Sequence, residues 1–283
     1  IIQRDWSSDV CSSDLAGVTG DHRGVRRPPM RQLMNLTSAL LDPLLVDGSP
    51  AQRMGPRITY YDDASGERTE LSTVTLANWA AKTANLLRDE FGAGPGSRVA
   101  VLLPAHWQTA AVLLGVWWIG AEVVPVGAGP TDGPEHAAPA DIALCTRDRL
   151  DDADAVATGG DVAVLSLDPF GRAADDLPIG VTDFATAVRV HADQITPEPN
   201  PGPALPGRSA DDVLAAARAE ASDQRLGPAD RVMSARPWGT AEEIVHNLLA
   251  VWAAGASLVQ LANPDPSALE RRRETEKVTR AAQ

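Results

Sequence analysis

Two stretches of this chain, residues 98–120 and 231–255, repeat the same order of residue types. Each begins with Arg-Val three residues after a proline, continues as an apolar strand, carries a late tryptophan and ends in Gly-Ala before a second apolar run. The arginines, Arg98 and Arg231, lie 133 residues apart, and the glycines, Gly120 and Gly255, lie 135 apart. A strand, a helix and a second parallel strand form a right-handed crossover unit. The duplication therefore predicts two such units.

The segments around the repeats alternate between strand and helix patterns. The pattern predicts a hairpin from residues 58–61 and 68–71, strands at 99–103, 121–126, 142–145 and 162–167, and helices at 73–91, 108–119, 147–155, 182–192 and 210–224. Ser72 or Thr73 is predicted to cap the first helix and Gly92 to end it, while Thr240 and Glu243 have the spacing of a capping box. Short apolar strands that alternate with helices are typical of a parallel sheet covered by helices. The predicted fold class is α/β with a mostly parallel sheet.

Composition shifts along the chain indicate four segments. Residues 1–33 read as a non-native or disordered leader, residues 34–196 as a first α/β subdomain, and residues 208–283 as a second, shorter α/β unit. Between them, residues 197–207 contain prolines at 197, 199, 201, 203 and 206, a composition typical of an extended linker. The tail, 267–280, is predicted to be a charged helix that is either solvated or docks on an absent partner.

The amino-terminal residues 1–15 resemble translated sequencing adapter. Residues 16–29 have no apolar periodicity and read like translated upstream DNA, so Met30 or Met34 is the expected start. No apolar core of a signal peptide follows a basic stretch here.

Charge and hydropathy exclude several classes of function. A net charge of −13 and a pI near 4.8 disfavour binding to nucleic acid or anionic membranes. The longest apolar run, residues 110–121, is shorter than the roughly 20 residues that cross a bilayer. Cys11 and Cys145 imply no disulfide framework, so a reducing, cytoplasmic compartment is expected.

Several residue groups suggest chemistry but have simpler interpretations. The glycines of residues 92–96 precede a strand, whereas a phosphate loop follows a strand and begins a helix, so they predict a structural turn. Ser166, Asp168 and His191 contain the residue types of a catalytic triad, but Ser166 lacks a nucleophile elbow and spacing does not show that they meet. A turn serine and an exposed histidine are favoured.

Other candidates point to packing rather than binding. His106 and His246 have no second ligand at metal spacing, so no metal site is predicted. Tryptophans are favoured as core residues, although a subset can line an apolar pocket; the six in question are Trp79, Trp107, Trp117, Trp118, Trp238 and Trp252. The arginines of residues 271–273 are offset by neighbouring glutamates, which favours a solvated helix.

The residues resemble the amino-terminal part of the adenylate-forming superfamily, the AMP-binding acyl-CoA synthetases and adenylation domains. Matching segments are Ile58-Thr59-Tyr60, Gly96 to Leu102 and the Leu114-Gly115 to Pro125 stretch. More closely, residues 165–169 and 183–185 resemble a short uncharacterised actinobacterial branch related to those enzymes. The likeness covers about residues 34–283.

That resemblance implies a reaction in which a carboxylate attacks ATP to give an acyl-adenylate. The family's Ser/Thr/Gly-rich loop ends in Pro-Lys and binds the departing phosphates, and a second lysine lies on a mobile lid. In this chain Lys82 and Lys277, its only lysines, follow no glycine-rich loop, and residues 205–211 stand where the loop is expected. No catalytic residue carries over. Arg208 and Ser209 remain as weak candidates for cofactor binding. ATP or AMP is possible as a cofactor, but no motif in the sequence supports either.

The leading hypothesis is a degenerate, non-catalytic acyl-CoA synthetase-like protein that binds an acyl or nucleotide ligand. One alternative is a truncated acid-CoA ligase or adenylation enzyme. Another is a protein-interaction module that docks a partner through its acidic surface or terminal helix.

Overall fold

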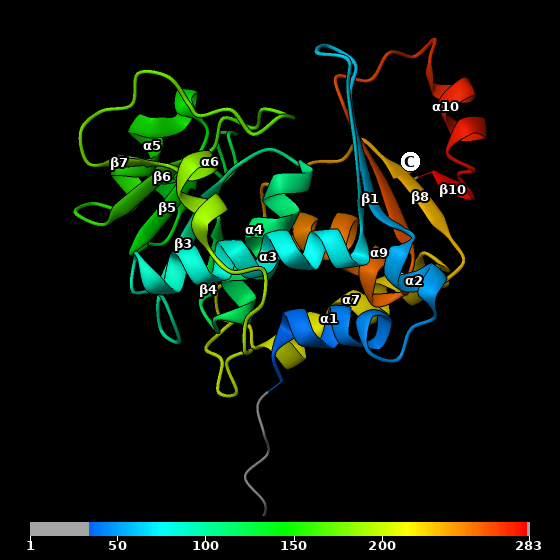
Figure 1. Ribbon diagram of the computed structural model, residues 1–283, viewed down its shortest axis with the longest axis horizontal. Coiled ribbons are helices and arrows are strands. Elements are labelled where there is room, and N and C mark those ends of the chain that lie inside the picture. Colours follow the sequence, from blue (N-terminus) through cyan, green and yellow to red (C-terminus); the bar gives the residue numbers. More distant parts are fainter. Residues whose placement is uncertain (1–33, 282–283) are drawn as a thin grey trace, which may run out of the picture. The chain divides into compact units, whose positions relative to one another are not determined.

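The computed structural model describes residues 34–281. The predictions for residues 1–33, including the adapter-like peptide and Met30, lie outside this range. The described strands form two five-stranded sheets (Figure 1). The first has the order β10 (Arg280–Ala281), β8 (Arg231–Ser234), β9 (Ser257–Ala262), β1 (Pro56–Asp62) and β2 (Glu67–Ser72). The second has the order β4 (Glu122–Pro125), β3 (Arg98–Leu102), β5 (Ile142–Cys145), β6 (Asp161–Val164) and β7 (Val181–Asp183).

Parallel pairing dominates both sheets, as predicted. Among the named strands of residues 34–281, β1 and β2 alone pair antiparallel. They form the predicted hairpin, and its turn ends at Gly66, whose φ of 77° suits glycine. β1 also pairs in parallel with β9, with Ile58 opposite Leu258. The hairpin therefore completes the sheet that contains the second repeat.

The two repeats are structurally equivalent down to single hydrogen bonds. Before β3 the Ser97 amide donates to Gly94, and before β8 the Asp230 amide donates to Gly227 in the same way. At the helix ends, Gly120 and Gly255 have φ of 74° and 77° and donate to Trp117 and Trp252. The next amide of each copy donates five residues back, which completes a Schellman motif. The repeated sequence thus forms the same crossover unit twice, with one copy in each sheet.

The two extra residues of the second copy have defined places. One lies between strand and helix, because nine positions separate Arg98 from the helix start at Trp107 while ten separate Arg231 from Ala241. The other lies inside the helix, which runs over 107–118 in the first copy and 241–253 in the second. The second helix contains a π-helical segment, Ile244–Leu249, and such a segment accommodates an extra residue within a helix.

Helices cover both sheets, and their bounds are as follows. The α-helices are α1 (Leu36–Leu45), α2 (Pro50–Met54), α3 (Thr73–Asp89), α4 (Trp107–Trp118), α5 (Leu150–Val156), α6 (Phe184–Ala187), α7 (Ala210–Asp223), α8 (Ala241–Glu243), α9 (Ala250–Ala253) and α10 (Leu269–Thr275). Short 3-10 helices are η1 (Pro134–His136), η2 (Arg147–Arg149) and η3 (Val188–Val190), and η4 (Ile244–Leu249) is the π-helical segment. Capping by Ser72 and by Thr240 with Glu243 follows the prediction.

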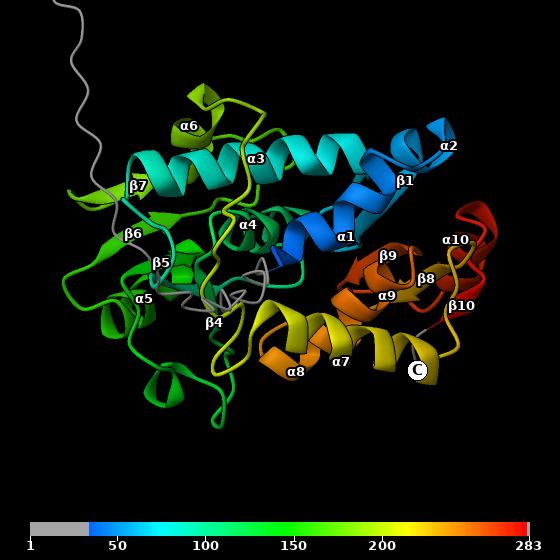
Figure 2. The same ribbon diagram turned by 90° about the horizontal axis from the view of Figure 1, so that it is seen from below.

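The core centres on α4. All twelve of its residues are buried, and it packs against α1, α3 and β1. A helix that is apolar on every side belongs in the interior of a protein. Figure 2 shows α1 and α3 beside α4, with α7 and α9 next to each other on the side of the first sheet. Trp117 and Trp252, the equivalent tryptophans of the two repeats, are 1% and 2% exposed.

Two predictions about element type are wrong. The predicted helix at 182–192 is instead β7, α6 and η3, because Asp183 accepts from the Thr186 amide and starts the helix there, while residues 181–183 pair with β6. The tail is not a solvated helix over residues 267–280. It forms the shorter α10 and then β10, and Arg272 and Glu276 are buried against the β1–β2 hairpin.

The proline-rich segment 197–207 is extended and packed against the first repeat. Glu198 donates its amide to Trp118, and Gly202 donates to Gly120. The Ala204 carbonyl accepts from both the Trp117 indole at 2.7 Å and the Val123 amide at 3.1 Å. None of the helices within residues 34–281 is long and apolar enough to span a membrane.

Gly115 lies where α4 packs tightly against α3. A Cβ at this position would lie 2.9 Å from the Ala80 carbonyl oxygen and 3.0 Å from Thr83 Cβ. We expect Gly115→Ala to lower the free energy of unfolding by about 1–3 kcal/mol, because overpacking outweighs the better helix propensity of alanine. Thermal unfolding monitored by circular dichroism measures the change. Gly94→Ala is the matched control, since nothing lies within 4 Å of its Cβ position, and an unchanged melting temperature for Gly115→Ala would contradict the packing argument.

Candidate functional site

A crevice of about 520 Å³ lies where the carboxyl ends of the two repeats face each other. In open α/β sheets, ligands bind outside the carboxyl ends of the strands. Loops 103–105 and 235–239, which follow the equivalent strands β3 and β8, line the crevice. Residues 126–128 after β4 and residues 260–264 at the end of β9 line it too. Each repeat thus contributes the same two loops.

Glycines let the two copies approach across this crevice. A Cβ on Gly239 would lie 3.2 Å from Gly127 Cα, so the backbones of the two loops are in contact. The Arg149 guanidinium fixes one side by donating to the Val126 carbonyl at 2.9 Å and the Gly127 carbonyl at 2.8 Å. The Gly239 amide donates to the Glu243 carboxylate at 2.7 Å, which holds the other loop to its helix start.

Two buried polar atoms on the lining of this crevice have no hydrogen-bond partner among the described residues. They are Oε1 of Gln260 and Nε1 of Trp238, whose residues are 1% and 3% exposed. The Gln260 amide nitrogen donates to the Arg236 carbonyl at 3.1 Å, which fixes the plane of the side chain. Buried polar atoms without partners are rare, because each costs its desolvation free energy. The unpaired acceptor and donor therefore belong to residues of the crevice wall and lie just beneath its surface.

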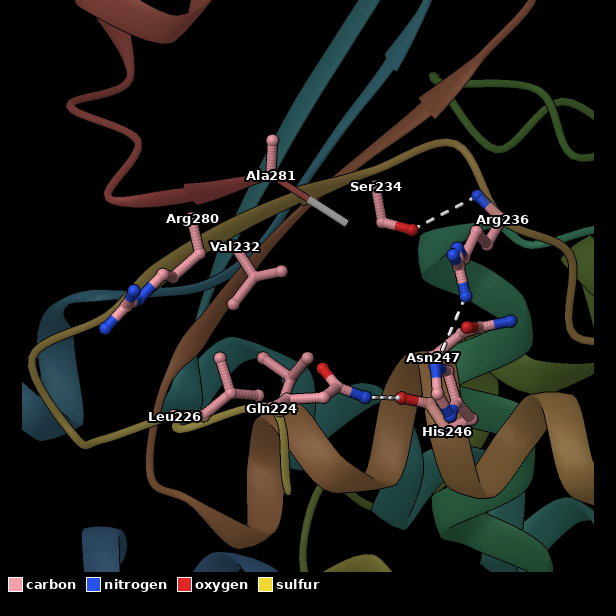
Figure 3. A pocket seen from close by; sticks show the side chains of 10 residues that line it. Gln224, Leu226, Val232, Ser234, Arg236, His246, Asn247, Arg280 and Ala281 are labelled. Atoms are coloured by element: carbon pink, nitrogen blue, oxygen red, sulfur yellow. Dashed lines mark hydrogen bonds between the residues drawn. The ribbon is translucent and has the colours of Figure 1, made fainter. Parts of the chain in front are cut away.

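A smaller pocket of about 330 Å³ adjoins this crevice at Arg236, which lines both (Figure 3). Its polar groups are largely paired with one another. The Arg236 amide donates to Ser234, its guanidinium donates to the His246 ring at 3.2 Å, and Gln224 donates to the His246 carbonyl at 3.1 Å. The other ring nitrogen of His246 lies 2.9 Å from the Glu220 carboxylate. This network joins α7 to the second repeat and serves the scaffold.

The candidates Arg208 and Ser209 lie at the amino terminus of α7, after a tight turn. Leu205, Pro206, Gly207 and Arg208 form a β-turn in which Gly207 has a φ of 68° and the Arg208 amide donates to the Leu205 carbonyl at 2.9 Å. Proline followed by glycine is the favoured pair for the centre of a type II turn. Ser209 caps α7 and forms a capping box with Asp212. Both candidates therefore have local structural roles in this turn.

The three residues with catalytic-triad chemistry do not meet. Ser166 Oγ donates to the Arg172 carbonyl at 2.6 Å, and the Asp168 carboxylate pairs with the Arg172 guanidinium at 2.9 Å. His191 Nε2 lies 2.8 Å from the Glu90 carboxylate, at the end of α3. The interpretation of Ser166 as a turn residue is confirmed. The expectation of an exposed histidine is wrong, because the His191 side chain is 11% exposed and lies just after η3.

His106, like His246 in the second repeat, has structural partners. His106 caps α4 by accepting from the Gln108 amide at 3.1 Å, and it packs edge-to-face on Tyr60 with ring centroids 4.3 Å apart. Burial lowers the pKa of His106, while the nearby Glu67 carboxylate raises it less, so the net direction is down. Within the described part of the chain, no group of three or more metal-ligating side chains is found.

Sequence reasoning missed the crevice residue Gln260, and it named Trp238 only as one of six tryptophans that pack in the core or line a pocket. Their positions in the second repeat could have indicated the site. Trp238 follows the first strand of that repeat, Gln260 lies near the end of its second strand, and ligands bind at the carboxyl ends of such strands. Identifying such residues requires knowing that the two repeats face each other, and this cannot be deduced from the spacing of residues in the sequence. Trp79 and Trp107 line a separate pocket, whereas Trp117 and Trp252 are core residues, so both predicted roles of tryptophan occur.

Comparison with known proteins identifies the fold. The family model of the AMP-binding enzymes matches residues 49–142. Solved structures with the same fold include the Brucella canis acyl-CoA synthetase (TM-score 0.67, 20% identity, 88% of this chain and 47% of that one) and the acetoacetyl-CoA synthetase of Streptomyces lividans (TM-score 0.68, 20% identity, 88% and 42%). This chain spans about half the length of those enzymes and resembles their amino-terminal lobe.

A relative from Mycobacterium tuberculosis strain H37Rv is far more similar. It is described as a TIGR03089 family protein and is 63% identical over 249 residues, which cover 87% of this chain and 97% of the relative. The described region therefore shares the fold of the amino-terminal lobe of these synthetases, and residues 49–142 match the AMP-binding family model. The chain belongs to the TIGR03089 family.

Proposed function

We propose that this protein is a non-catalytic relative of the acyl-CoA synthetases that binds an acyl or nucleotide ligand in the crevice between its two repeats. The observation that carries this proposal is the turn at residues 205–209. It stands where the resemblance to the adenylate-forming enzymes predicts the phosphate-binding loop.

The backbone of this turn leaves no run of amides for an anion. A phosphate cradle needs successive main-chain N–H groups that converge on one point. Here the Arg208 amide donates to the Leu205 carbonyl, the Leu205 amide donates back to the Arg208 carbonyl at 3.3 Å, and Pro206 has no N–H group. The amides that would face a polyphosphate are instead used within the turn.

Charge at the start of α7 also opposes a polyphosphate. The helix amino terminus is the usual seat of a bound anion, but its first turn carries Asp211 and Asp212. The Ser209 side chain and amide donate to the Asp212 carboxylate and lower its pKa, so this residue is ionised at neutral pH. An anionic ligand would meet negative charge here rather than free amides.

The crevice supports the binding half of the proposal. Gln260 Oε1 needs a donor and Trp238 Nε1 needs an acceptor, and a nucleobase or an acyl amide supplies both. The volume of about 520 Å³ lies within the range typical of small-molecule sites. One of the solved structures with this fold, an anthranilate CoA ligase, is a complex with anthranoyl-AMP.

Calorimetric titration of the full chain with AMP, ATP and coenzyme A tests this proposal. We expect saturable binding of AMP or coenzyme A, with ATP binding no tighter than AMP because nothing holds its outer phosphates. Gln260→Leu should weaken the binding about tenfold through loss of the buried acceptor. The matched control, Gln224→Leu in the neighbouring pocket, should leave the affinity unchanged.

Tenfold tighter binding of ATP than of AMP would contradict the missing phosphate cradle. If no nucleotide binds and fatty acyl amides also fail, the binding half of the proposal is wrong. A specific protein complex seen by light scattering would then favour the interaction-module alternative.

A further inference from the structure

A third pocket, of about 540 Å³, lies between α3 and the chain that follows β6, and we call it the aromatic pocket. Its walls include Trp79, Trp107 and Phe184, and Phe170 stands at its rim with 83% of its surface exposed. The two tryptophan rings meet edge-to-face with centroids 5.6 Å apart and planes at 66°. Figure 2 shows α6, which carries Phe184, beside α3. No lining residue is shared with the crevice between the repeats.

The charge of the aromatic pocket is opposite to that of the protein. The whole chain has a net charge of −13, yet the lining contains Lys82 and Arg189 and no carboxylate. Lys82 is one of only two lysines in the sequence. Charged side chains that line an otherwise apolar pocket orient the polar end of a ligand. The lining therefore favours a ligand that has an apolar body and a negatively charged end.

Both cations are held in place by the backbone and keep donors to spare. Lys82 Nζ donates to the His191 carbonyl at 2.5 Å, and an ammonium group has two further N–H donors. Arg189 donates to the Gly171 carbonyl, which ties the rim of the pocket to η3. Carboxylates close to this region have other partners: Asp168 binds Arg172, Glu90 binds His191, and Glu67 accepts from Trp107 Nε1 at 3.2 Å. None of these contacts involves Lys82 or Arg189.

We propose that the aromatic pocket binds a small apolar carboxylate, with its ring or chain against Trp79, Trp107 and Phe184 and its carboxylate at Lys82. An ammonium that has lost part of its hydration gains from a charge-assisted hydrogen bond to carboxylate. The apolar walls supply the hydrophobic part of the affinity, and tryptophan is well suited to contact planar ligands. This site is independent of the ligand proposed for the crevice.

A pair of probes with the same ring tests the proposal in the full chain. Naphthoate carries the carboxylate, and naphthalenemethanol is its uncharged counterpart. We expect calorimetry to show naphthoate binding at least tenfold more tightly than the alcohol. Lys82→Gln should weaken naphthoate about tenfold and leave the alcohol unchanged, because only the charged contact is lost.

The chain offers a matched control in its other lysine. Lys277→Gln makes the same change of charge at an exposed position and should leave both probes unaffected. Lys82→Met, read by the same titrations and checked for folding by circular dichroism, guards against a defect specific to glutamine. Equal affinities for acid and alcohol, no binding of naphthoate, or an unchanged affinity in both Lys82 variants would overturn the proposal. Loss of naphthoate binding in Gln260→Leu alone would place the ligand in the crevice and overturn it as well.

Discussion

Trp117→Ala is expected to lower the free energy of unfolding by about 3–5 kcal/mol, the largest loss for any single substitution considered. Trp117 is 1% exposed and is one of the largest fully buried side chains of the described region. Its indole donates to the Ala204 carbonyl at 2.7 Å. Truncation to alanine removes the apolar contacts of the ring, leaves a cavity and breaks this hydrogen bond to the segment that leads into α7. Urea unfolding followed by far-UV circular dichroism measures the change.

Trp117→Phe separates the two contributions. Phenylalanine keeps most of the apolar volume but cannot donate, so we expect a smaller loss of about 1–2 kcal/mol from the hydrogen bond and the partial cavity. A decrease of less than 1 kcal/mol in the free energy of unfolding of Trp117→Ala would contradict the role of Trp117 as a main packing residue of the core.

Glu276→Gln is expected to cost about 1–3 kcal/mol of stability at neutral pH, because it removes the buried carboxylate that Arg68 and Arg231 share and leaves only the half-exposed Glu70 as their charge partner. The Glu276 side chain is 4% exposed and accepts from Tyr61 at 2.5 Å, from Arg68 at 2.9 Å and from Arg231. These bonds join the tail to strands β1, β2 and β8 of the first sheet. Thr275→Val on the exposed side of α10 is the control and should change the stability little.

The effect of Glu276→Gln should depend on pH in a defined direction. Burial raises the pKa of Glu276, but hydrogen bonds from Tyr61, Arg231 and Arg68 outweigh burial and hold its pKa below the ordinary value. A carboxylate with a lowered folded-state pKa stabilises fully above its unfolded pKa of about 4.3 and loses this contribution as the pH falls through the folded value. The difference between wild type and variant should therefore shrink below about pH 4. A difference that stays constant from pH 7 to pH 3 would contradict the charge argument.

Much of the fold follows from local signals in the sequence. Repeated Arg-Val and Gly-Ala pairs predicted the two crossover units, and the same Schellman hydrogen bonds at Gly120 and Gly255 explain why the repeat is visible. The hairpin turn, the Ser72 cap and the Thr240 capping box are also local, because each is decided by residues within a few positions.

Features that depend on contacts between distant residues could not be predicted. The tail has a helical, charged pattern, but its burial depends on Tyr61 and Arg231, which lie 215 and 45 positions away. The crevice depends on how the two repeats face each other, so Gln260 appears in sequence as an ordinary strand residue. The paired amides of the turn at Pro206-Gly207 are likewise visible only in three dimensions.

The most direct test of the missing phosphate cradle is acid-dependent exchange between ATP and pyrophosphate, measured with the full chain and a broad panel of carboxylic acids. An active acyl-CoA synthetase under the same conditions serves as the positive control. We predict no exchange above the protein-free background with any acid. Saturable exchange that requires both this chain and a particular acid would contradict the proposal that the chain is non-catalytic.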